Sequence, residues 1–174
     1  MQKDEGYAAT FPWSRGWLKI WSNKETKNEA FLPIYKGHSP EWIPPIQTRS
    51  RCSLFIKYKD MNILIDSSPD VKSQLLNNKI KKIDFVVYTH EHADQTHGIN
   101  ELRPFFWVNK KKIPIYADKK TSNYLLNSFN YLFVKQSRYY KPILKMNVIK
   151  NNFFLNKNKN TIQLETINVR HGDI

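Results

Sequence analysis

Three of the five histidines in this chain of 174 residues gather in one short segment. His90, His92 and His97 lie within eight residues, and Asp94 stands between the second and the third. Imidazole nitrogens are favoured ligands for zinc and similar ions. Because residues two apart in an extended segment point to the same side, His90 and His92 can converge on one ion, with Asp94 near enough to serve a second. The pattern predicts a divalent metal site.

A loop that merely happens to hold histidines is the alternative interpretation. The segment directly follows Ile83–Tyr88, whose continuous β-branched and aromatic residues predict a buried strand. Sites in layered α/β folds lie where strands end and loops begin, so this position favours the metal site. His38 is expected to be a surface histidine. Cys52 faces a strand core and is expected to be structural, although a thiol near the metal stays an open alternative.

Strands and helices alternate around the histidine segment. Two apolar runs, Cys52–Tyr58 and Asn62–Asp66, predict a β-hairpin, and Ser67-Ser68-Pro69-Asp70 predicts a helix with a serine cap followed by proline. The other expected elements are a helix from Gly98 to Phe106, a strand over Ile113–Ala117, a helix from Asp118 to about Phe133, and strands over Ile143–Lys150 and Thr161–Val169 around the polar Asn156–Asn160 turn. This order predicts a mixed α/β layered domain.

Residues 1–48 differ from the rest, since five prolines interrupt them and four of the five tryptophans lie there. We expect mostly irregular structure, with a short strand or helix near Trp17–Trp21, followed by a domain over residues 49–174. No apolar run is long enough to span a membrane, and the N-terminus lacks the pattern of a secretory signal. A single cysteine excludes a disulfide within the chain, so the cytoplasm is the expected compartment.

The formal net charge of +13 raises the question of a phosphate-rich partner. The lysines accompany asparagine and isoleucine, as in Asn77–Lys82, which is typical of an AT-rich coding sequence whatever the function. The basic runs are also short and scattered along the sequence. Composition alone therefore favours coding bias over nucleic-acid binding.

The segment Thr89–Gly98 resembles the His-x-His-x-Asp-His signature of the metallo-β-lactamase superfamily. Further stretches are similar to the PhnP-like hydrolases, the cyclic phosphodiesterase branch named for the phosphonate operon: Arg51–Leu54, Ile65–Asp70, Tyr88–Arg103 and Arg170–Ile174. The resemblance covers about residues 49 to 174. It implies the αββα sandwich of that superfamily in incomplete form, a truncated N-terminal half without the later aspartate and histidine ligands.

The resemblance also implies roles for individual residues. His90, His92 and His171 would bind the first metal, and Asp94 would bind the second and help to orient the nucleophile. Asp66 would orient the motif loop from behind the ligands. Two alternatives stay open: Asp66 could cap the helix that follows it, and His171 could be a solvated residue of the tail.

His97 and Gln95 lie next to the expected ligands in the sequence. His97 is expected to be a structural or supporting residue rather than a ligand. Gln95 stands where the superfamily usually has a histidine for the second metal, and a neutral amide is a weaker ligand for zinc than imidazole. We therefore expect zinc or manganese, one ion rather than two, with Gln95 as a possible weak ligand.

The function that the resemblance implies is metal-dependent hydrolysis, with an activated water attacking a phosphodiester or ester. A small phosphodiester or an RNA-like molecule is the expected substrate. Two alternatives are a catalytically inactive remnant of such a hydrolase and a basic nucleic-acid-binding protein. Strands such as Ile143–Lys150 would expose apolar surface in a half sandwich, so a homodimer or a separately encoded second half is also expected.

Overall fold

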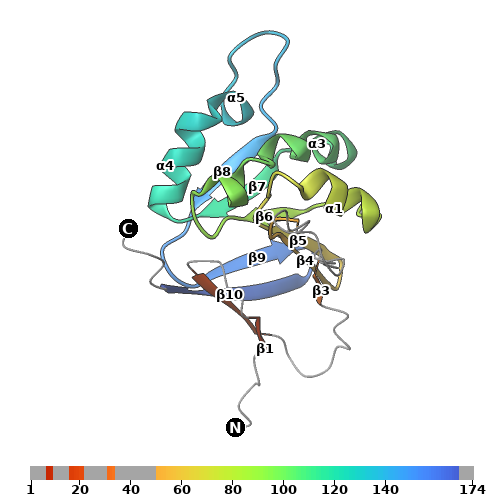
Figure 1. Cartoon of the computed structure of the whole chain (residues 1–174), viewed down its shortest axis with the longest axis vertical. Helices are drawn as coiled ribbons and strands as arrows, with labels where there is room; N and C mark the ends of the chain where they lie inside the picture. Colours follow the sequence, from red (N-terminus) through yellow and green to blue (C-terminus); the bar gives the residue numbers. More distant parts are fainter. Residues whose placement is uncertain (1–6, 10–15, 22–30, 34–49, 169–174) are drawn as a thin grey trace, which may run out of the picture.

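Two β-sheets and one layer of helices form the described part of this computed structural model, which comprises residues 7–9, 16–21, 31–33 and 50–168 (Figure 1). The larger sheet has the strand order β3-β4-β5-β6-β7-β8 and the smaller sheet the order β1-β2-β10-β9. The strands of the larger sheet are β3 (Phe31–Pro33), β4 (Leu54–Tyr58), β5 (Met61–Ile65), β6 (Phe85–Val87), β7 (Ile113–Ala117) and β8 (Leu144–Val148). Those of the smaller sheet are β1 (Tyr7–Ala9), β2 (Gly16–Trp21), β9 (Phe153–Lys157) and β10 (Asn160–Asn168).

The helices connect the parallel strands of the larger sheet. They are α1 (Val71–Asn77), α2 (Ala93–Thr96), the 3-10 helix η1 (Ile99–Leu102), α3 (Arg103–Asn109), α4 (Lys119–Ser128) and α5 (Asn130–Phe133). Strands β5 to β8 all run in one direction. All the loops that follow these strands therefore meet at one end of the sheet, and all the loops that precede them meet at the other end.

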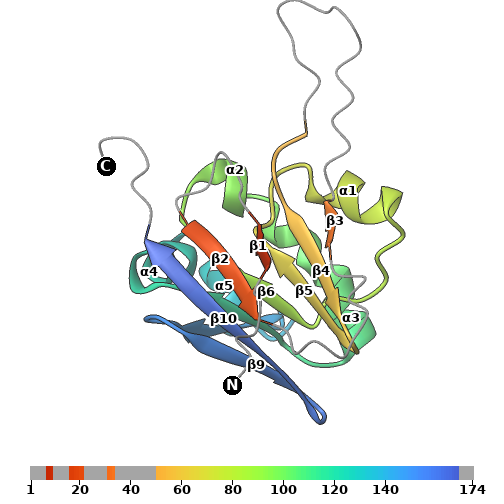
Figure 2. The same cartoon turned by 90° about the horizontal axis from the view of Figure 1, so that it is seen from below.

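Side chains alternate across the larger sheet, because successive residues of a strand point to opposite faces. Phe55, Leu64 and Val86 are buried in the core cluster on the helix side. Their neighbours Leu54, Ile63 and others pack against the smaller sheet, in a second cluster. The result is three layers of helices, larger sheet and smaller sheet, which Figures 1 and 2 show from two directions.

The predicted mixed α/β architecture is confirmed, and the β4–β5 hairpin is where the sequence predicts it. Strand β9 (Phe153–Lys157) was not predicted from the sequence. This strand pairs with β10 across the polar turn. The predicted strand over Ile143–Lys150 appears as β8 and joins the larger sheet beside β7 instead. Its apolar exposure is mixed, since Ile143 and Leu144 are fully buried whereas Val148 is 49% exposed.

Two predicted helices differ in detail. The serine cap is wrong: α1 begins at Val71 with Asp70 in the N-cap position and no side-chain cap. The long helix after Asp118 is interrupted at Phe129, whose φ and ψ of −125° and 34° separate α4 from α5. Asp118 itself caps α4, since its carboxylate accepts the Thr121 N–H at 2.8 Å.

The described parts of residues 1–48 are three short strands. Strand β2 covers the predicted strand or helix near Trp17–Trp21 and pairs with β10, whereas β3 pairs with β4. The other residues of this segment lie outside the described residues. No helix in the described part of the chain is long and apolar enough to cross a membrane.

Candidate functional site

The histidine segment lies at the end of the sheet where strands β5, β6 and β7 finish. Strand β6 ends at Val87, and the Tyr88 N–H donates to the carbonyl of Tyr116 next to the end of β7 at 2.8 Å. His90 is only 3% exposed, and His92 is half-buried at the N-cap of α2. The centroids of their imidazole rings are 4.6 Å apart. The two rings therefore lie next to each other, and their convergence on one ion stays a prediction.

Asp66 holds this loop from the end of β5. The carboxylate of Asp66 accepts the backbone N–H and the hydroxyl of Thr89, each at 2.8 Å. The Thr89 hydroxyl also lies 3.0 Å from Nδ1 of His90. Because the single hydroxyl proton goes to Asp66, we infer that His90 Nδ1 carries a proton and donates it, so that Nε2 carries the ring's lone pair.

The environment of Asp66 is unusual in two ways. Its φ of 58° lies in the left-handed region, which costs energy for any residue other than glycine and tends to occur at functional sites. Burial raises the pKa of Asp66 from 3.8 to about 7, the hydrogen bonds from Thr89 act in the opposite direction, and the charge of Asp94 adds a smaller increase. The alternative role as a helix cap is absent, because Asp66 contacts Thr89 and α1 has no side-chain cap.

Backbone hydrogen bonds join the loop after β5 to the histidine segment. The Ser67 N–H donates to the carbonyl of Gln95, and the Gly98 N–H donates to the carbonyl of Ser67, both at 2.8 Å. A Cβ atom on Gly98 would lie 2.0 Å from the carbonyl oxygen of Ser68. Only glycine fits at this position, since the neighbouring atom belongs to the backbone.

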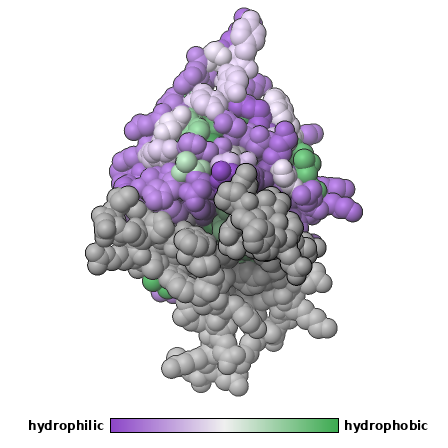
Figure 3. All heavy atoms as spheres, in the orientation of Figure 1, coloured by the Kyte–Doolittle hydropathy of each residue, from purple (hydrophilic) through white to green (hydrophobic). Residues whose placement is uncertain are grey.

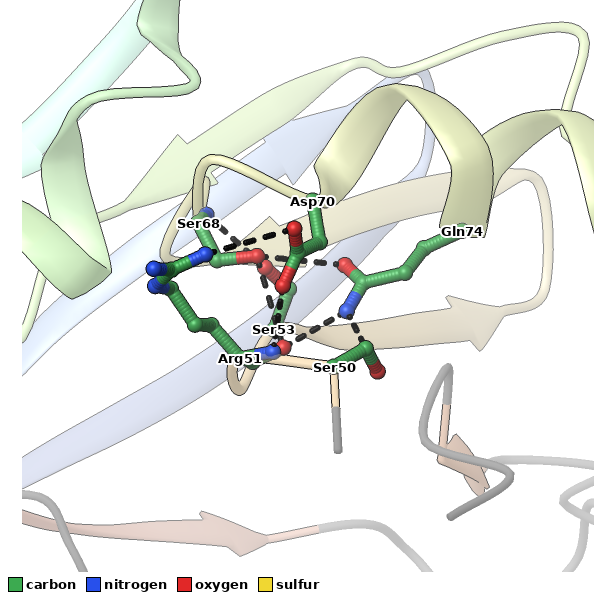
Figure 4. A network of polar contacts seen from close by, with 6 residues as sticks. All are labelled: Ser50, Arg51, Ser53, Ser68, Asp70 and Gln74. Carbon is green, nitrogen blue, oxygen red and sulfur yellow. Dashed lines mark hydrogen bonds and ion pairs between the residues drawn. The ribbon is translucent and has the colours of Figure 1, made fainter. Parts of the chain in front are cut away.

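A polar network holds the same loop from its other side (Figure 4). The Ser68 N–H donates to Ser53 Oγ at 3.0 Å, and the buried Gln74 amide donates to the carbonyl of Arg51 at 2.6 Å. Asp70 accepts the Arg51 N–H at 2.7 Å. The residues predicted to cap a helix thus connect the start of β4 to the loop that holds Asp66.

Asp94 and Gln95 lie in α2, one exposed and one buried. The Gln95 side-chain amide donates to Asp94 Oδ2 at 3.0 Å. Gln95 therefore holds the carboxylate of Asp94 in this structure, and its role as a possible weak ligand stays a prediction. Burial raises the pKa of the half-buried Cys52 thiol, and the carboxylates of Asp66 and Asp94 raise it further, which indicates that Cys52 lies close to both.

His97 turns away from the other two histidines. Its Nε2 lies 3.0 Å from the Tyr124 hydroxyl on α4, and its ring makes an edge contact with Phe129 at 5.7 Å. This arrangement agrees with the structural role predicted for it. His38 and His171 lie outside the described residues.

One contact at the rim was missed by sequence reasoning. Lys120 in the first turn of α4 forms an ion pair of 2.6 Å with Glu91, the residue between the two histidines. Lys120 and Glu91 are 29 positions apart in the sequence. No local pattern could have paired them, because the contact depends on β6 and β7 being neighbours.

The described residues supply part of a metal-binding set. The two imidazoles of His90 and His92 have the donor chemistry and the spacing that one divalent ion requires. Within residues 50–168 and the three N-terminal strands, no three His, Cys, Asp or Glu side chains lie close enough together to hold an ion. His171, the residue predicted as a third ligand, lies outside the described residues.

Known proteins are similar to parts of this chain. A family model described as "Beta-lactamase superfamily domain" matches residues 61–174. A solved diphosphatase of the PhnP family is 27% identical, with a TM-score of 0.58, over 74% of this chain and 52% of that one. Zn²⁺-bound PqqB from Methylobacterium extorquens is 17% identical with a TM-score of 0.46, over 72% of this chain and 47% of that one, a likeness of fold alone.

One relative of this chain is named for acyl transfer and not for hydrolysis. An octanoyltransferase of Porphyromonas gingivalis is 34% identical over 103 residues, which is 59% of this chain and 20% of that protein. The chain thus spans a fifth of that relative and about half of the PhnP-family diphosphatase.

Proposed function

The chain belongs to the beta-lactamase superfamily and has part of the metallo-β-lactamase fold, and from this premise we propose that it is a metal-dependent hydrolase of phosphodiesters. The observation that carries the proposal is the pair of imidazoles at the end of β6, with ring centroids 4.6 Å apart. The similarity to a PhnP-family diphosphatase supports the choice of a phosphate ester as substrate. The match to the octanoyltransferase covers too little of that protein to support acyl transfer.

His90 and His92 would hold the ion through imidazole nitrogens, and His171 would provide a third. A divalent ion such as zinc or manganese supplies Lewis acidity, which makes a water more acidic and offsets negative charge on the substrate. The hydrogen bond that the Thr89 hydroxyl donates to Asp66, and the one that it accepts from His90 Nδ1, would fix the tautomer and the angle of the ring. Such supporting contacts are worth about 10-fold to 100-fold in metal affinity.

Asp94 is the residue proposed to orient the attacking water. Its carboxylate is exposed at the start of α2, where a substrate in solution can reach it, and the Gln95 amide fixes one of its oxygens. Residues 49–174 would form this half of the hydrolase domain. A second copy of the chain or a separately encoded second half is the proposed partner.

Turnover of bis(p-nitrophenyl) phosphate tests the proposal. The purified full chain, supplied with Zn²⁺ or Mn²⁺, should release nitrophenolate, and Asp94→Asn should reduce the rate by about 100-fold or more. Glu101→Gln is the matched control, since it removes a carboxylate of the neighbouring helix η1, and it should keep the wild-type rate. Absence of turnover with either metal, at a protein concentration that favours self-association, would identify the chain as an inactive relative of these hydrolases.

A further inference from the structure

The loops at the two ends of the parallel sheet carry opposite charges. The three loops that follow β5, β6 and β7 (residues 66–70, 88–92 and 118) hold four acidic residues and no lysine or arginine: Asp66, Asp70, Glu91 and Asp118. The three loops that precede β6, β7 and β8 (residues 78–84, 110–112 and 134–143) hold nine basic residues: Lys79, Lys81, Lys82, Lys110, Lys111, Lys112, Lys135, Arg138 and Lys141. We call these nine residues the basic end.

All nine side chains of the basic end are exposed, and the one acidic residue in these loops, Asp84, is buried. Runs that are scattered along the sequence come together because β6, β7 and β8 are parallel neighbours whose starting points share one end of the sheet. Ile113, the first residue of β7, donates its N–H to the carbonyl of Ile143, which ends the third loop, at 2.9 Å. So many like charges at one end repel one another unless a polyanion neutralises them.

The loop between α5 and β8 adds aromatic side chains to this charge. It projects beyond the rest of the molecule at the top of Figure 1, and the surface there is mostly hydrophilic in Figure 3. Tyr139 is 91% exposed and stands between Arg138 and Tyr140. On α3, Trp107 is 60% exposed, three residues before the first lysine of the second loop.

Contacts at its base brace this loop. The guanidinium of Arg103 lies 4.4 Å from the centroid of the Tyr140 ring, which also makes an edge contact with Tyr131 at 5.8 Å. The Tyr140 N–H donates to Ser137 Oγ at 3.1 Å. The position of the Tyr139 backbone is thereby fixed while its side chain faces solvent.

We propose that the basic end binds single-stranded nucleic acid, with its cations on the phosphates and Tyr139 stacked on a base. Exposed cations interleaved with exposed aromatic rings are the combination by which proteins bind single strands without sequence preference. An acidic protein would use the charges and leave the stacking surface of Tyr139 without a partner, whereas an anionic membrane would use both, so phosphatidylserine vesicles form one arm of the test. The proposal is independent of hydrolysis, because the histidine segment lies at the opposite end of the strands.

Fluorescence anisotropy with a labelled 15-nucleotide oligo(U) RNA tests this proposal. The full chain is used in EDTA, which keeps the result independent of any metal site. Replacing Lys135, Arg138 and Lys141 with glutamine should weaken binding at low salt by about 10-fold or more and reduce the slope of log K against log salt by about 2. Tyr139→Ala should weaken binding by about 10-fold with the slope unchanged.

The matched control removes three exposed lysines beyond the other end of the strands. Lys72, Lys119 and Lys150 follow β5, β7 and β8, and their replacement with glutamine lowers the net charge equally. This variant should bind RNA within about twofold of the wild type. Three results would each overturn the proposal. They are an equal loss of RNA affinity in this control, an unchanged RNA affinity in Tyr139→Ala, and sedimentation with phosphatidylserine vesicles in place of RNA binding.

Discussion

The two ends of the parallel strands β5 to β8 are stabilised in different ways. At the end where β5 and β6 finish, buried polar groups of Asp66, Ser67 and Gly98 hold the histidine segment through hydrogen bonds of 2.8 Å. At the other end, the nine basic side chains of the basic end are exposed, and the one acidic residue of the same loops, Asp84, is buried. At the first end, close packing means that a single substitution should change the free energy of unfolding strongly. At the second end, many exposed side chains carry the charge, so a single substitution should change it little.

Gly98→Ala should have the largest effect on stability. The new Cβ would meet the Ser68 carbonyl oxygen at 2.0 Å and Val71 Cγ1 at 2.6 Å, so the two loops must move apart. We expect a loss of about 3 kcal/mol or more in the free energy of unfolding, measured in urea. Lys111→Ala, at the exposed basic end, should change it by less than about 0.5 kcal/mol. Equal stabilities of the two variants would mean that the two ends do not differ in this way.

Lys157→Met tests the ion pair between Lys157 and Asp84, the one buried acidic residue in the loops of the basic end. Lys157 Nζ lies 2.8 Å from Oδ2 of the buried Asp84 and also donates to the Asp60 carbonyl, so it joins β9 to the larger sheet. Removing Lys157 leaves the buried Asp84 with only the half-exposed Lys82, whose Nζ lies 3.8 Å from Oδ1, and we expect a loss of about 3 kcal/mol. Adding Asp84→Asn should recover part of it, whereas Lys159→Met, an exposed change in the same hairpin, should be neutral. An unchanged free energy of unfolding in Lys157→Met would show that this ion pair does not stabilise the fold.

Asp66→Asn should change how stability depends on pH. The folded protein raises the pKa of Asp66 from 3.8 to about 7, so the folded state binds more protons than the unfolded state between these values. This contribution is complete below about pH 4 and is lost as pH rises toward 7, with about 2 kcal/mol disappearing between pH 5 and pH 7. The asparagine variant lacks it.

Urea unfolding of both proteins at several pH values, in EDTA, measures this contribution. Asparagine tolerates the left-handed φ and keeps a carbonyl for the Thr89 N–H, so the variant should fold. The stability of the wild type relative to Asp66→Asn should fall as pH rises. A difference that stays constant from pH 5 to pH 8 would contradict a raised pKa of Asp66.

Sequence patterns predicted the elements of this fold well where a pattern is local. The two apolar runs of the β4–β5 hairpin and the apolar run that ends at Tyr88 are local signals, and both elements are in the structure. The serine cap failed because the hydroxyls of Ser67 and Ser68 bond to distant groups, the Tyr88 hydroxyl and the Arg51 carbonyl, which no local rule can foresee. The Lys120–Glu91 ion pair and the basic end likewise depend on which strands become neighbours.

The most direct test of the proposed site is a measurement of bound metal. The full chain and its His92→Ala variant are dialysed with Zn²⁺ and then analysed for metal by mass spectrometry, beside His97→Ala, whose imidazole contacts Tyr124 instead. The two-imidazole centre predicts about one ion in the wild type, little or none in His92→Ala, and a nearly normal content in His97→Ala. Equal zinc content in the wild type and His92→Ala would contradict the assignment of the ligands.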